Sequence, residues 1–299
     1  MTCNLTYLLA DIGGTNSRFA LSRGAALERD TIASFRNDGM PSPGAALTRY
    51  VHKVNPARID RVCLAAAGPV LGDRITLTNR NWQISAGQIA ALTGCDDIRF
   101  INDLQAMGYA LADEDLTGRK PAGTRLVLAI GTGTNCAVLY ESDGRRFVPP
   151  AEAGYIALPH IGARYAPVLD KLAEQFGTPV IEAALSGPNL PALHRAVTGE
   201  TQEPAHILSR ANRTPSLELI LRIFGATLGT LALTHLPRDG IFLAGSVGVA
   251  LFQWTRHPAF TSTYLDRGPY RDLVKDIAIR DIKDEFAPLV GAARLVAQT

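Results

Sequence analysis

The sequence predicts an α/β protein built from two domains of related topology. Strand and helix signals alternate through the first third of the chain, which is typical of α/β architecture. The chain has 299 residues, and single hydrophobic cores stop growing at roughly 250–300 residues, so two domains are expected. A pattern of strand, glycine turn and strand near the N-terminus also recurs in the middle of the chain, which favours a duplicated domain.

The first elements are expected to form a hairpin. Residues 7–10 are an apolar run that ends at a glycine turn, residues 11–15, and strand character resumes at residues 18–21. The elements expected next are a strand at 31–35, a helix at 45–54, a buried strand at 61–67, a helix from the N-cap Ser85 to residue 92, a strand at 97–101, and a helix that begins at Asn102 and Asp103.

The pattern then restarts with a strand at 125–130, a glycine turn at 131–135 and a return strand at 136–140. The rest is expected to be mostly helical, with helices at 165–176, 179–185, 191–197, 205–210, 217–235 and 286–296, and short strands at 240–243 and 277–279. Both glycine turns contain Gly-Thr-Asn. Chance similarity of two hairpin turns is one interpretation. The other is a duplication whose two turns face each other across a cleft, which suits a ligand with several phosphates.

Composition excludes several classes of protein. The net charge is +2, so there is no general electrostatic attraction to nucleic acid or to an anionic membrane. No apolar stretch is expected to reach the ~18 residues of a membrane span, and the N-terminus reads as a strand rather than a signal peptide. The four cysteines, Cys3, Cys63, Cys95 and Cys136, form no C-x-x-C pair. They indicate free thiols in a reducing cytoplasm.

The two glycine turns are candidates for phosphate binding. Glycine lets a ligand approach the main chain closely, and a tight turn can aim successive N–H groups at one anion. Asp11 stands at the end of the first strand, where its carboxylate would repel phosphate unless Mg²⁺ intervened. The alternative is ordinary hairpin turns in which Asp and Gly satisfy the turn geometry. Neither turn has the G-x-x-x-x-G-K-[ST] pattern of a P-loop.

Asp103 is a candidate general base. It follows an apolar strand, and carboxylates at the carboxyl end of such strands lie where α/β sheets bind ligands. Phosphoryl transfer to a hydroxyl needs alignment, charge neutralisation and a proton acceptor, which an Asp can provide. Asn and Asp are also favoured helix caps. The residues alone favour the cap and the base about equally.

Taken together, ordered segments over nearly the whole chain resemble the bacterial glucokinase family, of the actin-like ATPase and sugar-kinase superfamily. The segments are Asp11-Ile12-Gly13-Gly14-Thr15-Asn16-Ser17-Arg18; Gly68-Pro69 with Thr78-Asn79 and Trp82; Ile101-Asn102-Asp103; Gly131-Thr132-Gly133; Glu152-Ala153-Gly154; Glu182 with Leu185-Ser186-Gly187-Pro188; Ala244-Gly245-Ser246; Asp266-Arg267-Gly268; and Leu289-Val290-Gly291-Ala292-Ala293. A single D-x-G-G-T is moderately specific, whereas the ordered set is highly specific.

The resemblance implies two actin-like (ribonuclease H-like) α/β domains with an interdomain cleft, and an ATP-dependent hexokinase that phosphorylates the 6-hydroxyl of glucose with Mg²⁺. Asp103 matches the catalytic base. The matching sugar ligands are Asn102, Glu152, Tyr155 and Glu182. The matching ATP-binding residues are Ala10, Asp11, Ile12, Gly13, Gly14, Thr15, Asn16, Gly131, Thr132, Gly133, Gly245 and Ser246, with Asp11 also as the metal ligand.

Two segments depart from the family pattern. The family usually reads Gly-Glu-Gly-Gly-His around the sugar carboxylate, whereas this chain has Tyr155 in place of the histidine. A phenol can bond a sugar hydroxyl but has a different reach, which leaves the preferred hexose open. The second turn continues with Thr134 and Asn135 where the family tends to be richer in glycine.

The expected domains are residues 1–113 with the C-terminal helix 286–299, and residues 114–285. The expected partners are a hexose, most simply glucose, and a second copy of the chain in a cytoplasmic homodimer, with no nucleic acid and no membrane. The alternatives are a kinase for another hexose, a catalytically weak sugar-binding regulatory protein, and an actin-like ATPase that acts on a protein partner.

Overall fold

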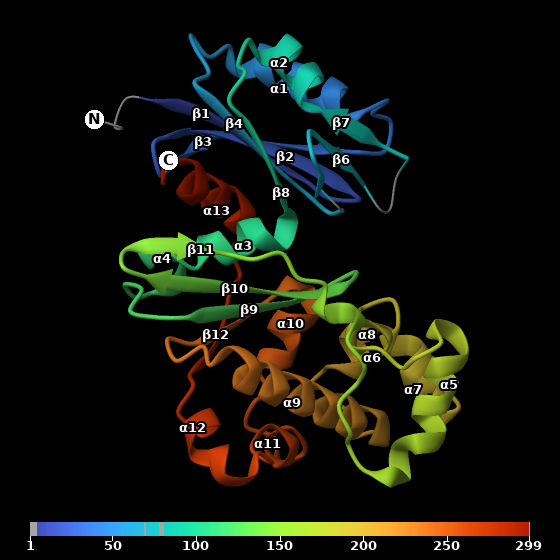
Figure 1. The fold of residues 1–299 in the computed structure, drawn as a ribbon. Helices are drawn as coiled ribbons and strands as arrows, with labels where there is room; N and C mark the ends of the chain where they lie inside the picture. Colours follow the sequence, from blue (N-terminus) through green and yellow to red (C-terminus); the bar gives the residue numbers. More distant parts are fainter. Residues whose placement is uncertain (1–4, 69, 78–80, 299) are drawn as a thin grey trace. The chain divides into compact units, whose positions relative to one another are not determined.

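The computed structural model describes residues 5–68, 70–77 and 81–298, and it divides into two units (Figure 1). The first comprises residues 1–121 and 284–299, and the second comprises residues 122–283. Cys3, Pro69 and the segment Thr78-Asn79, which entered the sequence analysis, lie outside the described residues.

The first unit is built on a five-stranded sheet in the order β3-β2-β1-β4-β8. The strands are β1 (Thr6–Ile12), β2 (Asn16–Arg23), β3 (Ala26–Arg36), β4 (Arg61–Ala66) and β8 (Ile98–Asn102). The first three form an antiparallel meander, whereas β4 runs parallel to β1 and β8 runs parallel to β4. The carboxyl ends of β1, β4 and β8 therefore share one edge of the sheet.

Helices cover both faces of this sheet (Figure 1). One face carries α1 (Pro43–Val54) and α2 (Ala86–Thr93), and the other carries α3 (Asp103–Ala110) and α13 (Ala287–Val296). Strand β1 is consequently buried along its whole length. Gly291 of α13 lies so close to α3 that a Cβ atom there would overlap the carbonyl oxygen of Ala106. A short third sheet, β5 (Val70–Leu71), β6 (Arg74–Thr76) and β7 (Gln83–Ser85), completes the unit.

The short helix α4 (Glu114–Thr117) belongs to the first unit, although the sequence places a boundary before it. Asp113 accepts a hydrogen bond from the N–H of Leu116 and so caps α4. The same carboxylate accepts from Nε of Arg294 on α13 over 3.1 Å. These contacts attach α4 to the C-terminal helix.

The second unit repeats the sheet of the first. Its order is β11-β10-β9-β12-β13, with an antiparallel meander followed by two parallel strands. The strands are β9 (Arg125–Ile130), β10 (Thr134–Ser142), β11 (Arg145–Phe147), β12 (Ile241–Ala244) and β13 (Ile279–Asp281). The shared order confirms the expected restart and places both glycine turns at the same point, between the first two strands of each sheet.

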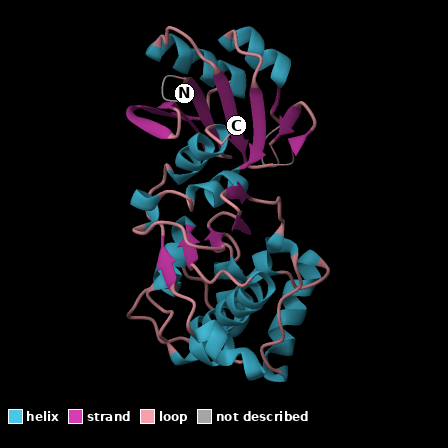
Figure 2. Ribbon diagram, turned by 60° about the vertical axis from the view of Figure 1, so that its left-hand side comes forward, coloured by secondary structure: helices cyan, strands magenta, loops and turns pink. Residues whose placement is uncertain are grey.

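Helices make up most of the rest of the second unit (Figure 2). They are α5 (Ala166–Phe176), α6 (Ile181–Leu185), α7 (Leu190–Thr198), α8 (Pro204–Ile207), α9 (Pro215–His235), α10 (Gly245–Phe252), α11 (Pro258–Tyr264) and α12 (Arg271–Lys275). The sequence missed the short elements α4, β11 and α12, the helices α10 and α11, and the third sheet of the first unit. It also placed β13 two residues early.

Helix α9 corrects one expectation, because it contains an 18-residue window with a mean hydropathy of 1.5. Within the described ranges it is the one helix long and apolar enough to cross a membrane. However, 72% of that window is buried inside the protein. Its apolar side chains belong to the core of the second unit, with Ile220, Phe224 and Leu228 fully buried. Core packing accounts for its composition.

Candidate active site

The first glycine turn, between β1 and β2, is shaped by a buried asparagine. The Nδ2 of Asn37 donates to the carbonyl oxygens of Gly13 (2.8 Å) and Gly14 (3.3 Å), and its backbone N–H donates to that of Thr15 (2.8 Å). Asn37 is fully buried. In a planar trans peptide, each N–H points away from the preceding carbonyl. The next N–H groups of the turn therefore face away from Asn37, as an anion cradle requires.

Asp11 lies at the end of β1, beneath this turn, and is 6% exposed. Its Oδ2 is 3.3 Å from Nη1 of Arg18, whose Nη2 lies 2.9 Å from Oε2 of Glu285. Burial raises the pKa of the Asp11 carboxyl, and the charge and hydrogen bond of Arg18 oppose that rise. Asp11 thus already has a cation beside it. Among the described residues, no group of three or more His, Cys, Asp or Glu side chains is arranged to hold a metal ion.

Asn102 and Asp103 stand at the carboxyl end of β8, on the same sheet edge as Asp11. Asn102 is the N-cap of α3: its Oδ1 accepts from the N–H of Leu104 over 2.8 Å, and its own N–H donates to Gln105 to complete a capping box. Asp103 is the first residue of the helix, and its Oδ1 also accepts from Leu104. The capping role that the sequence left open therefore falls mainly to Asn102.

The second glycine turn, between β9 and β10, is held from beneath by α6 and the loop after it. Gly187 donates its N–H to the carbonyl of Gly131 over 2.7 Å, and Gly131 donates to the carbonyl of Gly133 over 2.8 Å. Within the described part of the chain, the N–H groups of Thr132 and Gly133 make no hydrogen bond. They are the donors that this turn can offer to a phosphate.

Glu182 on α6 lies directly against the second turn. Its Oε2 accepts from the N–H of Thr134 over 2.7 Å. A Cβ at Gly133 would lie 2.9 Å from that oxygen, so a larger residue there would push the Glu182 carboxylate out of its present position. The predicted sugar ligand Glu182 therefore contacts the predicted phosphate-binding turn directly.

Glu152 is brought to the same place by the segment that follows β11. The Nδ2 of Asn135 donates to Oε2 of Glu152 over 3.2 Å. Burial raises the pKa of Glu152, and the negative charge of nearby Glu182 raises it further. The structure thus places two carboxylates near each other, beside the start of the strand that leaves the second turn.

The segment that carries Glu152 packs tightly on β10. A Cβ atom at Gly154 would overlap the carbonyl oxygen of Thr134, so only glycine fits at this position. Tyr155, which stands in place of the family's histidine, ends a 3-10 turn, Ala153–Tyr155, and its side chain is 63% exposed. Its phenol is therefore accessible to a ligand.

The predicted ATP-binding residues Gly245 and Ser246 form the beginning of α10. Gly245 has φ +76°, and a Cβ there would overlap the carbonyl oxygen of Ile130 at the end of β9. Glycine thus lets α10 begin beside the second turn, where both Gly245 and Ser246 are exposed. The first N–H groups of a helix attract anions.

The structure therefore forms two clusters of predicted site residues, one in each unit. In the first, the turn after Asp11 shares a sheet edge with Asn102 and Asp103. In the second, the turn at residues 131–133 adjoins Glu152, Glu182 and Gly245. Sequence reasoning missed Asn37 and assigned no contact to Asn135. The available signals were that Asn37 lies two residues after an expected strand and that Asn135 ends the expected glycine turn.

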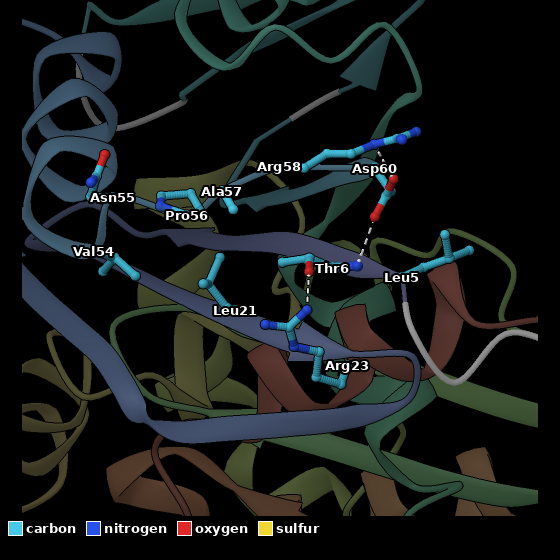
Figure 3. A pocket seen from close by; sticks show the side chains of 10 residues that line it. All are labelled: Leu5, Thr6, Leu21, Arg23, Val54, Asn55, Pro56, Ala57, Arg58 and Asp60. Atoms are coloured by element: carbon cyan, nitrogen blue, oxygen red, sulfur yellow. Dashed lines mark hydrogen bonds and ion pairs between the residues drawn. The ribbon is translucent and has the colours of Figure 1, made fainter.

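A polar cavity at the opposite end of β1 is unrelated to these clusters (Figure 3). It is lined by Thr6, at the start of β1, together with Arg23 and Arg58. Arg58 is 2.6 Å from Asp60, whose other oxygen accepts from the N–H of Thr6. Ligands of α/β sheets bind at the carboxyl ends of the strands, and this cavity lies at their amino ends.

The repeated sheets, each with a glycine turn after its first strand, define an actin-like α/β fold of the kind that sugar kinases use. Solved structures that share this fold include the following two. A glucokinase from an Antarctic psychrotroph has a TM-score of 0.83 and 24% identity, covering 98% of this chain and 99% of that one. A ROK family glucokinase from Streptomyces griseus, in complex with glucose and AMPPNP, has a TM-score of 0.66 and 17% identity, covering 98% of this chain and 100% of that one.

The chain belongs to the Glucokinase family, whose model matches residues 8–299. A glucokinase of Stenotrophomonas maltophilia (strain R551-3) is 31% identical over 318 residues, an alignment that covers 97% of this chain and 94% of the relative. The expected family and fold class are thus confirmed, and the chain is a hexose kinase by family.

Proposed function

We propose that this protein transfers the γ-phosphoryl group of ATP to the 6-hydroxyl of glucose. The observation that carries the proposal is the position of Glu152 and Glu182 beside the second glycine turn. Carboxylates accept strong hydrogen bonds from hydroxyl groups, and a polyol offers several such donors. Acceptors for a polyol next to donors for a phosphate suit a sugar kinase, whereas an ATPase acting on a protein does not need them.

Asp103 is the proposed general base. It accepts the proton of the attacking hydroxyl while Asn102, whose Oδ1 is committed to capping α3, offers its amide N–H groups to the sugar. Little covalent chemistry is needed from the protein beyond alignment and charge stabilisation.

ATP is the proposed donor, with its phosphates at the turn after Asp11 and at Gly131, Thr132 and Gly133. AMPPNP in the Streptomyces griseus neighbour supports a nucleotide of this kind. Mg²⁺ keeps several waters and commonly takes one or two carboxylates together with substrate phosphates. A single buried carboxylate, Asp11, fits that need through water, because Arg18 already occupies one side of it. The ion would neutralise phosphate charge in the reaction.

The test is an ADP-release assay with ATP and a panel of aldohexoses, with 6-deoxyglucose included. Glucose should be turned over, and 6-deoxyglucose should compete with it without being phosphorylated, because it lacks the acceptor hydroxyl. Turnover of 6-deoxyglucose would show that another hydroxyl is the acceptor. ATP hydrolysis that no sugar changes would contradict the proposal as a whole.

The exposed Tyr155 favours a second candidate, which is a kinase for another hexose. Its ring differs in reach from the family's histidine, so a hexose other than glucose at the head of the ranking would support this candidate. Binding of sugar without any turnover would instead indicate a regulatory sugar-binding protein.

We also propose a cytoplasmic homodimer that binds neither nucleic acid nor membranes. Light scattering on the purified protein tests its mass.

A further inference from the structure

Asn135 makes four hydrogen bonds that tie the start of β10 to the segment carrying Glu152. Its Nδ2 donates to the carbonyl oxygen of Ala151 over 2.7 Å and to Oε2 of Glu152 over 3.2 Å. Its Oδ1 accepts from the N–H of Ala153 over 2.9 Å and from that of Cys136 over 2.8 Å. One amide therefore holds the residue before Glu152, its carboxylate, and the residue after it.

The neighbouring residue holds the other carboxylate. Thr134 donates its N–H to Glu182 over 2.7 Å, and its carbonyl oxygen packs on Gly154. Consecutive residues, Thr134 and Asn135, thus fix Glu182 and Glu152 to the strand that leaves the second glycine turn. A displacement of this turn would therefore move both carboxylates.

We propose that Asn135 is a positioning residue for sugar binding, which holds Glu152 in the orientation that accepts a sugar hydroxyl and joins it to the phosphate turn. This inference rests on the proposed function of the same site. Asn135 acts through Glu152, since its own amide is fully engaged by the protein.

The surroundings of Glu152 make the donated hydrogen bond important. Burial raises the pKa of Glu152, and the like charge of Glu182 on α6 raises it further. A cavity of about 450 Å³ behind the segment is lined by Cys136 of β10 and His235 of α9 as well as by Glu152. Burial raises the pKa of Cys136 to about 11 and lowers that of His235.

At neutral pH the thiol and the imidazole are therefore uncharged, and neither of them stabilises the Glu152 carboxylate. The amide of Asn135 stabilises it, because a hydrogen bond donated to the ionised form favours that form. Loss of this donor should raise the pKa of Glu152 further. Ionised Glu152 would then require a higher pH.

The test compares Asn135→Asp and Asn135→Ala with wild type. Asn135→Asp keeps the shape and the acceptor oxygen but turns the donor into a second carboxylate that faces Glu152. We expect the Kd for glucose, measured by calorimetry, and the sugar KM to rise about tenfold or more. The acid limb of kcat/KM should move to higher pH, and the KM for ATP should change less.

The matched control is Asn212→Asp. Asn212 lies in the same unit, donates to the carbonyl of Ile207 over 2.8 Å and accepts from the N–H of Thr214 over 2.9 Å. It therefore repeats the chemistry of Asn135 in a loop away from the site. This variant should leave the glucose Kd and the pH profile unchanged.

A double-mutant cycle with Glu152→Gln separates positioning from general stability. If Asn135 acts through Glu152, Asn135→Asp should weaken glucose binding much less in the Glu152→Gln background than in wild type. An equal loss of glucose affinity in both backgrounds would overturn the inference. So would an Asn135→Asp protein whose glucose Kd and acid limb of kcat/KM match those of wild type. Because calorimetry needs no turnover, sugar binding without catalysis would refute the proposed kinase activity and still test Asn135. A wild-type protein that binds no hexose would overturn both.

Discussion

The backbone N–H of Thr134 donates to Oε2 of Glu182 over 2.7 Å, which fixes a carboxylate to the residue that follows the second glycine turn. This contact removes one N–H group from the set available to a phosphate and leaves those of Thr132 and Gly133. The second glycine turn therefore takes part in two kinds of contact. It presents N–H donors at Thr132 and Gly133, and its end fixes Glu182, the proposed sugar ligand.

Asp103→Asn should leave the glucose Kd within about twofold while kcat falls by a factor on the order of 10² or more, because an amide cannot accept the hydroxyl proton. Asn is also compatible with the first turn of α3, so the helix should persist. Initial-rate kinetics and calorimetry measure the two effects. Asp96→Asn, an exposed carboxylate on the loop before β8, is the control. Wild-type kcat in Asp103→Asn would disprove the base assignment.

Gly154→Ala should weaken sugar binding without touching a ligand. The added methyl group would overlap the carbonyl oxygen of Thr134, so the segment carrying Glu152 must move. We expect the sugar KM to rise at least tenfold and stability to fall by about 1–3 kcal/mol. Gly87→Ala is the control, because a Cβ there meets no atom within 4 Å. A wild-type KM in Gly154→Ala would mean that the position of this segment does not determine sugar affinity.

The buried ion pair between Arg125 and Asp239 predicts a stability effect at the start of the second unit. Nε and Oδ2 are 2.6 Å apart, and the side chains are 0% and 4% exposed. Removing one partner leaves the other charge buried without its counter-ion. Asp239→Asn should therefore lower the free energy of unfolding, measured with urea, by roughly 3–5 kcal/mol. Asp73→Asn breaks an exposed pair with Arg74 and should cost less than about 1 kcal/mol. Similar losses in both variants would refute this account.

Arg294→Gln should have a pH-dependent effect on stability. Burial alone would raise the pKa of Asp113, but the hydrogen bond and charge of Arg294, together with the backbone N–H groups of Leu116 and Asp115, hold that pKa below its ordinary value of 3.8. A lowered pKa contributes stability above 3.8, and this contribution is lost as the pH falls through the folded-state value. The variant should therefore be less stable than wild type near pH 7, and the difference should shrink in acid. Arg271→Gln, at an exposed position, serves as control, and a difference independent of pH would contradict the linkage.

Local patterns in the sequence were sufficient to predict the repeated hairpins, because the glycine turn and the apolar runs on either side of it lie close together along the chain. The N-cap Ser85 and the helix beginning at Asp103 were predictable for the same reason. The contacts that shape the turns were not. Asn37 reaches Gly13 across 24 positions of the chain, and Asn135 reaches Ala151 across 16. Which partner an asparagine selects depends on tertiary packing, and the sequence carries no local signal for it.

The same limit explains the boundary at α4. The expected domains divide between Asp113 and Glu114, whereas the ion pair of Asp113 with Arg294, 181 positions away, keeps α4 with the first unit. Helix α10 was missed because its first turn is Gly245 and Ser246, residues that locally favour a loop. Its start is fixed by the close approach to Ile130.

Gly291→Ala should couple the C-terminal helix to catalysis. A methyl group at this position in α13 would overlap the carbonyl oxygen of Ala106 in α3, and the two helices must separate to accommodate it. Since α3 begins at Asp103, the proposed base should shift, and a shift of about 1 Å can cost on the order of 10² in rate. We therefore expect a lower kcat with a nearly unchanged ATP KM, together with a loss of stability of about 1–3 kcal/mol. Adding Asp103→Asn to Gly291→Ala should lower kcat far less than it does in wild type, because both changes act on the same group. Fully multiplicative losses in kcat would show that Gly291 matters only for the stability of the first unit.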